Sequence, residues 1–145
     1  YFYPLNDENV VRLQAAFERV VKGPIKHGEM DVNTRMIDTV AHADNAAWFE
    51  FSAICQVPRS EHDYLFLAEN FDYVFVSGVP QIKRNQDHLA TYFIHMVDVF
   101  YDKGTKLIIS AAVPMWDIYL EGSKTFEFER TKSRLQEMQS VEYLC

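Results

Sequence analysis

Two uninterrupted apolar stretches, with an amphipathic segment between them, constrain the fold of this chain most strongly. Residues 73–79 and 106–112 are continuous apolar runs that end near Pro80 and Pro114, and such runs are typical of strands in a parallel sheet covered on both faces. Residues 86–101 place one apolar stripe at helical spacing: Leu89, Phe93, Met96, Val97 and Phe100. Lys103-Gly104 is expected to end this helix. The three segments predict a parallel β-α-β unit with a right-handed crossover.

The first half predicts a helix followed by a small β-rich segment. Asn6 or Asp7 caps a helix that ends at Gly23-Pro24. Residues 25–51 alternate imperfectly, which predicts two or three antiparallel strands with turns near residues 33–34 and 44–45. Further helices are expected after Ser60, around residues 115–120, and over residues 126–145. The expected fold class is therefore α/β, with a mixed sheet in a single domain over residues 1–145.

Composition excludes several classes of protein. The chain has 145 residues, 48% of them hydrophobic and 24% charged, as expected for one globular domain. Its formal net charge of −7 argues against a nucleic-acid partner. The five histidines show no metal-ligand spacing, and Cys55 and Cys145 form no disulfide framework. Reduced thiols indicate a cytoplasmic location, and no apolar run reaches the length of a membrane span.

Three groups of residues are candidates for chemistry with phosphate. The first is the loop after the strand that ends in S-G-V-P (77–80), where Lys83 and Arg84 precede a helix whose free N–H groups could meet an anion. The sequence contains no G-x-x-x-x-G-K-[ST] motif, so a structural turn is the favoured interpretation of this loop. The second is Ser110, a polar residue that ends a buried strand; a hydroxyl bonded to local backbone is its favoured interpretation.

The third candidate is the pair Arg130 and Arg134, four residues apart on one helix face. Arginine contacts phosphate through a planar fork and stays protonated. The alternative is a solvated face on which these arginines pair with Glu127, Glu129 and Glu137, and spacing alone favours that alternative.

Six motifs occur in order along most of the chain. They are W-F-E-F-S-A-I-C (48–55), P-R-S-E-H-D-Y (58–64), F-D-Y-V-F-V-S-G-V-P (71–80), F-I-H-M-V-D-V-F-Y-D (93–102), K-L-I-I-S-A (106–111) and F-E-F-E-R-T-K-S-R-L-Q-E-M-Q-S-V-E-Y-L (126–144). This series resembles the C-terminal half of the ZapE/AFG-type ATPases, a branch of the AAA+ superfamily.

The resemblance implies much about function. The complete protein would bind and hydrolyse ATP with Mg²⁺, and the motifs that hold phosphate and magnesium would lie in a missing N-terminal ATPase half. The chain alone is then expected to bind neither and to be inactive. A cytoplasmic protein that regulates the division ring, with peripheral membrane association, a division-ring partner and a homo-oligomeric state, is implied; mitochondrial relatives would act in protein quality control.

The resemblance also bears on single residues. Arg130 and Arg134 match the family's R-T-x-S-R-L, so it implies arginine fingers or second sensors at these positions. Thr91 and Tyr92 stand where relatives often carry two arginines, which removes any basic role there. A rival hypothesis is a non-catalytic interaction module that recruits a partner through residues 30–51 and through Trp48 and Trp116. A standalone metabolic enzyme has almost no motif support.

Overall fold

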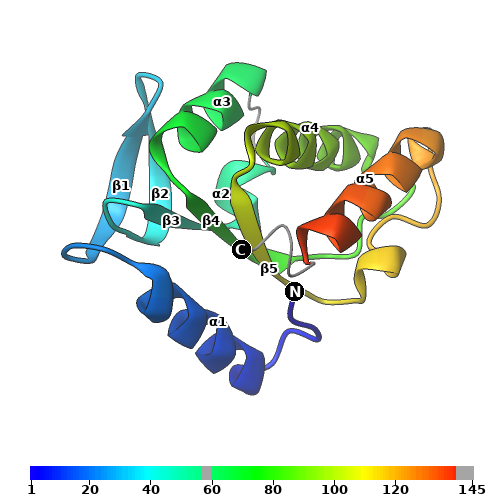
Figure 1. The fold of residues 1–145 in the computed structure, drawn as a ribbon. Coiled ribbons are helices and arrows are strands. Elements are labelled where there is room, and N and C mark those ends of the chain that lie inside the picture. The colour runs from blue at the N-terminus through cyan, green and yellow to red at the C-terminus, as the bar shows by residue number, and fades with distance from the viewer. Residues whose placement is uncertain (57–59, 140–145) are drawn as a thin grey trace.

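The structure is a computed structural model that describes residues 1–56 and 60–139. Its centre is one mixed sheet of five strands in the order β1-β2-β3-β4-β5 (Figure 1). The strands are β1 (Lys26–Val32), β2 (Arg35–His42), β3 (Ala46–Glu50), β4 (Tyr73–Val79) and β5 (Lys106–Ala111). β1, β2 and β3 are antiparallel neighbours, whereas β3, β4 and β5 run parallel. The expected α/β class and the parallel β-α-β unit are confirmed.

Five α-helices and one short 3₁₀ turn surround the sheet in the described part of the chain. They are α1 (Asp7–Val20), α2 (Phe51–Ile54), α3 (Glu61–Asn70), α4 (Asp87–Lys103), η1 (Met115–Asp117) and α5 (Thr125–Met138). The Asn6 side chain caps α1 by accepting the Asn9 N–H at 2.9 Å. Gly104, at φ 73°, ends α4 as the Lys103-Gly104 pair predicts.

Two predicted helices differ from the structure in length. The helix expected over residues 115–120 is a single 3₁₀ turn, because the Ile82–Tyr119 bridge and the bond from the Ile82 N–H to the Ile118 carbonyl extend the backbone after η1. The terminal helix begins at Thr125 and continues to Met138. The remainder of that prediction, residues 140–145, lies outside the described residues.

Helices cover the sheet on both faces (Figure 1). α1 lies on one face, and α3, α4 and α5 lie on the other. β4 shows why its sequence is apolar throughout: Val74 and Val76 pack into the larger core beneath α4, while Phe75 points to α1. On the α1 side, the Phe17 ring lies 5.2 Å from the Phe75 ring and 5.5 Å from the Trp48 ring.

Candidate functional site

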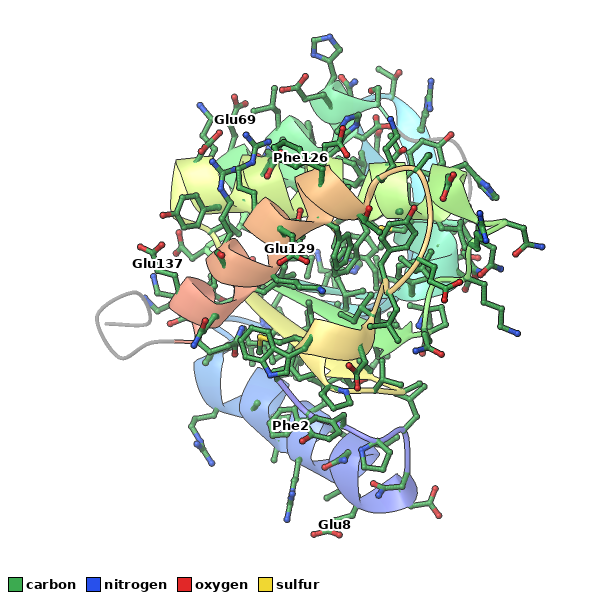
Figure 2. All side chains as sticks on the ribbon, turned by 90° about the vertical axis from the view of Figure 1, so that its right-hand side faces the viewer. Phe2, Glu8, Glu69, Phe126, Glu129 and Glu137 are labelled. Atoms are coloured by element: carbon green, nitrogen blue, oxygen red, sulfur yellow. The ribbon has the colours of Figure 1, made fainter. Side chains whose placement is uncertain are left out.

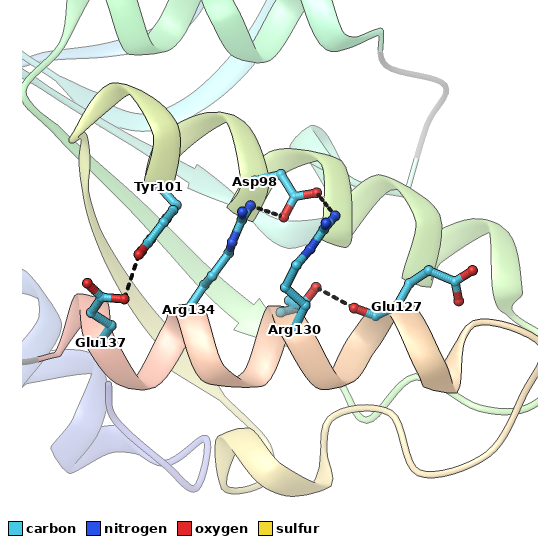
Figure 3. A network of polar contacts seen from close by, with 7 residues as sticks. Asp98, Tyr101, Glu127, Arg130, Arg134 and Glu137 are labelled. Carbon is cyan, nitrogen blue, oxygen red and sulfur yellow. Dashed lines mark hydrogen bonds and ion pairs between the residues drawn. The ribbon is translucent and has the colours of Figure 1, made fainter.

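The pair Arg130 and Arg134 lies on α5, where this helix packs against α4 (Figure 3). α5 is anchored by an inner face of four buried side chains: Phe128, Thr131, Leu135 and Met138. The α4 stripe predicted from sequence is buried, and its Phe93 stacks on Phe128 of α5 with ring centres 5.9 Å apart. Because the arginines flank the buried face of α5, their side chains cross to α4 rather than extend directly into solvent.

The Asp98 carboxylate on α4 accepts a hydrogen bond from each of the two arginines. The Arg134 Nη1 lies 2.7 Å from Oδ1 of Asp98, and the Arg130 Nη2 lies 3.1 Å from Oδ2. One carboxylate thus receives two guanidinium groups, each through a charge-assisted hydrogen bond. The three groups together carry one net positive charge.

The two arginines differ in how firmly they are held. The Arg134 side chain is 22% exposed, and its guanidinium carbon lies 4.7 Å from the centre of the Tyr101 ring, within cation–π range. The Tyr101 hydroxyl donates to Glu137 at 2.6 Å, and this bond raises the pKa of Tyr101. The Arg130 side chain is 60% exposed. Arg134 is therefore fixed between two elements, whereas most of Arg130 remains in solvent.

A depression of about 240 Å³ opens beside these side chains. Its lining contains both arginines together with Glu61, His95, Asp98, Val99 and Asp102. Sites that enclose a whole small molecule measure roughly 300–1,000 Å³. The depression is thus too small to enclose a nucleotide, and the chemistry open to this site is a contribution of positive charge to a group bound elsewhere.

Comparison with known proteins identifies the family. The family model described as AFG1-like ATPase matches residues 1–145. The chain belongs to the AFG1-like ATPase family. It is 36% identical over 142 residues to cell division protein ZapE of Escherichia coli strain K12, which covers 97% of this chain and 38% of that protein.

Two eukaryotic relatives are also similar to this AFG1-like chain. An uncharacterized protein of Schizosaccharomyces pombe is 35% identical over 122 residues, covering 82% of this chain and 27% of its own length. Lactation elevated protein 1 homolog B of Danio rerio is 30% identical over 88 residues, covering 61% of this chain and 18% of its own length. The chain spans less than two fifths of the length of each of these curated relatives. No solved structure matches it.

Asp98 is the residue of this AFG1-like site that sequence reasoning missed. The solvated-face alternative paired the arginines with Glu127, Glu129 and Glu137, but both pair with Asp98, 32 and 36 positions earlier in the chain. Glu129 pairs instead with Lys132 at 3.3 Å. One signal was present in the sequence: Asp98 is an acid between Val97 and Val99, inside the motif F-I-H-M-V-D-V-F-Y-D.

Ser110 lies apart from the arginines, inside the sheet. Its buried hydroxyl accepts the Gly78 N–H at 3.3 Å, and its backbone forms a parallel bridge with Phe2. The hydroxyl thus bonds to backbone, as the simpler interpretation predicts, but to the neighbouring strand β4, 32 positions earlier, rather than to backbone close in sequence. Ser77, which the structure places within β4, likewise accepts the indole N–H of Trp48 at 3.0 Å.

The start of α4, where Lys83 and Arg84 suggested an anion site, carries an acid of its own. Asp87 accepts the hydroxyls of Tyr119 and Ser123, each at 2.6 Å, and these bonds lower its pKa. Arg84 and Asp87 line a shallow depression of about 600 Å³ together with Glu121 and Ser123. Acids and one arginine share this lining, so it shows no built anion site.

Trp48 cannot contact a partner as the interaction-module hypothesis requires, because it is 8% exposed and packs beneath α1. Trp116 on η1 is half-exposed.

Over residues 1–56 and 60–139, no cluster of three or more His, Cys, Asp or Glu is arranged to hold a metal ion. No helix in this described part is long and apolar enough to cross a bilayer.

Proposed function

We propose that this chain is the C-terminal portion of an ATP-binding, ATP-hydrolysing AAA+ protein that acts in cell division, as ZapE is named to do. Membership of the AFG1-like ATPase family and 36% identity to ZapE over nearly the whole chain support this assignment. Within the complete protein, the chain completes a nucleotide site or an oligomer interface. It couples that site to a division-ring partner.

Arg130 is the residue that we assign to the nucleotide. One observation carries the assignment: two guanidinium groups share the Asp98 carboxylate, and Arg130 is the one whose side chain is mostly exposed. An exposed arginine on a rigid helix is suited to meet a γ-phosphate that another segment or subunit holds, and such an arginine stabilises charge in the transition state. Arg134 then serves to fix α5 against α4.

The described residues offer a candidate contact for ATP but not for Mg²⁺. The exposed Arg130 guanidinium fits a phosphate oxygen, whereas the described residues offer no carboxylate cluster for Mg²⁺. As the family resemblance implies, Mg²⁺ in the complete protein would be held by the N-terminal ATPase half. The chain alone is expected to be inactive.

The remaining parts of the proposal follow from the family. The partners are an N-terminal ATPase half, a second copy of the protein and a division-ring protein; the location is cytoplasmic, with peripheral membrane association at the division site. A net charge of −7 favours these partners over nucleic acid. The similarity to the E. coli cell division protein ZapE supports the cell-division part.

The first prediction concerns ATP turnover by the longer protein that carries this chain. Arg130→Ala is expected to lower turnover by about tenfold or more, because an arginine that stabilises phosphoryl transfer contributes at least this factor. The matched control is Arg12→Ala. The Arg12 side chain is 57% exposed, close to the 60% of Arg130, and it also pairs with an acid, Glu8. Arg12 lies on α1, on the opposite face of the sheet from α5. Steady-state phosphate release measures ATP turnover by both variants.

Mixing variants tests whether Arg130 acts on a neighbouring subunit. Arg130→Ala protein is combined with protein whose upstream phosphate loop is disabled, and recovery of turnover indicates a site shared between subunits. Turnover that stays at the wild-type level in Arg130→Ala would refute the assignment of this residue.

A non-catalytic interaction module remains the second candidate, and one side chain favours it. Phe126, in the first turn of α5, is 88% exposed and lies on the face of the molecule that Figure 2 turns to the viewer. An aromatic side chain in water is a common anchor at protein interfaces. Wild-type turnover in Arg130→Ala, combined with loss of partner binding in Phe126→Ser, would support this candidate.

A further inference from the structure

The Asp98 carboxylate holds Arg130 and Arg134 in different ways. Both of its oxygens are used, one by each arginine. Among the residues that the structure describes, Asp98 is the acid that pairs with Arg130, through Nη2 at 3.1 Å. An exposed ion pair of this length contributes little free energy, because water solvates both groups when it opens.

The surroundings of Arg130 would repel a phosphate. Glu61 and Asp102 line the same depression as Asp98, so three carboxylates face two guanidinium groups there, beside His95. A triphosphate placed against Arg130 in its present position would lie close to these acids, and like charges at short range oppose binding. Arg130 must therefore turn away from Asp98 to meet a phosphate.

Arg134 is not free to make the same movement. Its shorter contact with Asp98, at 2.7 Å, and its stacking on Tyr101 hold it in place. When Arg130 leaves, Arg134 still neutralises the Asp98 carboxylate. The site therefore has two states: in one Arg130 contacts Asp98, and in the other it does not, while Arg134 contacts Asp98 in both.

We propose that Asp98 competes with nucleotide phosphate for Arg130, so that it withholds this arginine until a phosphate displaces the carboxylate. The inference rests on the proposed function, since it needs a phosphate that Arg130 contacts. Asp98 acts through Arg130 and is a positioning residue. The competition lowers the fraction of molecules ready to engage nucleotide, and this lowers the apparent affinity by the same factor.

The test is Asp98→Asn in the longer protein that carries this chain, with Mg²⁺ and ATP well below the concentration that gives half-maximal turnover. Removing the competing charge is expected to raise turnover about two- to fivefold, the range that an exposed ion pair permits. Near saturating ATP the gain should shrink, because phosphate then displaces Asp98 without help. Asp98→Glu retains the competing charge and should therefore lose most of the gain expected for Asp98→Asn.

Asp38→Asn is the matched control, since it removes one exposed negative charge from β2, far from α5. Thermal melting of each variant separates folding from activity, because Asp98→Asn also deprives Arg134 of its partner. A purely structural role for Asp98 predicts a lower melting temperature with lower or unchanged turnover, and this result would overturn the inference.

Combining substitutions separates this inference from the proposed function. Asp98→Asn together with Arg130→Ala should match Arg130→Ala alone, because no arginine is left to release. If Arg130→Ala itself leaves turnover unchanged, the proposed function fails. If Arg130→Ala lowers turnover and Asp98→Asn does not raise it, only the competition is refuted.

Discussion

Asp87 shows how one half-buried acid organises the loop between η1 and α5. Its two oxygens accept the Tyr119 and Ser123 hydroxyls, and the Tyr119 oxygen also accepts the Lys124 N–H at 3.0 Å. Gly122 lies against this cluster at φ 147°, and a Cβ there would overlap the Tyr119 oxygen. The loop therefore requires both the carboxylate and the missing side chain.

This cluster predicts a specific pH dependence. Hydrogen bonds to the ionised form hold the pKa of Asp87 below its ordinary value of 3.8. A carboxyl whose pKa is lower in the folded state stabilises the protein above about pH 4, and this contribution disappears as pH falls through the folded pKa. The free energy of unfolding of wild type should therefore exceed that of Asp87→Asn at pH 7.

The measurement is urea denaturation of both proteins from pH 7 to pH 2.5. The difference in free energy of unfolding between them should narrow steadily below pH 4. A difference that stays constant over this range would show that the Asp87 hydrogen bonds do not favour its charged form.

The candidate site could be predicted from the sequence only in part. Helical spacing places Arg130 and Arg134 on one face, and the match of R-T-K-S-R-L to the family motif singled them out as site candidates. Asp98 could not be assigned to them, because a carboxylate on a helix surface has many available partners. The crossing of α4 and α5 selects among these partners, and it depends on packing of residues far apart in sequence.

At the scale of single elements, the β1–β2 hairpin carries local strain. Val32 pairs with Arg35, so Asn33 and Thr34 alone form the turn, at φ 53° and 72°. Two-residue hairpin turns require this left-handed backbone, which asparagine tolerates well. Thr34 is β-branched, and its side chain disfavours the same conformation.

Thr34→Gly is therefore expected to stabilise the protein by about 1 kcal/mol, since relief of left-handed strain outweighs the flexibility that glycine adds to the unfolded chain. Chemical denaturation measures the change. Asn33→Gly is the control, and its gain should be smaller because asparagine is already suited to the turn. Destabilisation by Thr34→Gly would indicate that the threonine side chain makes a contact worth more than the strain.

The elements themselves follow closely from local sequence. The cap at Asn6, the turn at residues 33–34 and the stop at Gly104 were all predicted, because each depends on the chemistry of one or two residues. The antiparallel pairing of β3 with β2 agrees with the strands predicted over residues 25–51. Its parallel pairing with β4 was not predicted, because these strands are more than 20 residues apart in sequence and their pairing is chosen by the whole sheet.

For the whole molecule, the sheet separates two apolar clusters of unequal size. The larger lies beneath α3, α4 and α5, and the smaller lies beneath α1 around Leu13, Phe17 and Trp48. α1 thus depends on few buried side chains, of which Phe17 contacts both Trp48 and Phe75.

Phe17→Ala is expected to lower the free energy of unfolding by roughly 3–5 kcal/mol, the usual cost of emptying a fully buried aromatic position. Val10→Ala, on an exposed position of the same helix, should change it by less than about 0.5 kcal/mol. Hydrogen exchange should show that α1 loses protection before α4 does. Equal loss of protection in both helices would mean that the two clusters unfold as one unit.

The burial of Trp48 also gives the molecule an optical reporter on the α1 side. Its indole is sealed beneath α1 and bonded to Ser77, whereas the indole of Trp116 on η1 is half-exposed. Tryptophan emission shifts to longer wavelength when water reaches the ring, so the two indoles report on different surroundings. A protein with Trp116→Phe would reveal through fluorescence alone whether events at the arginines of α5 are felt across the sheet.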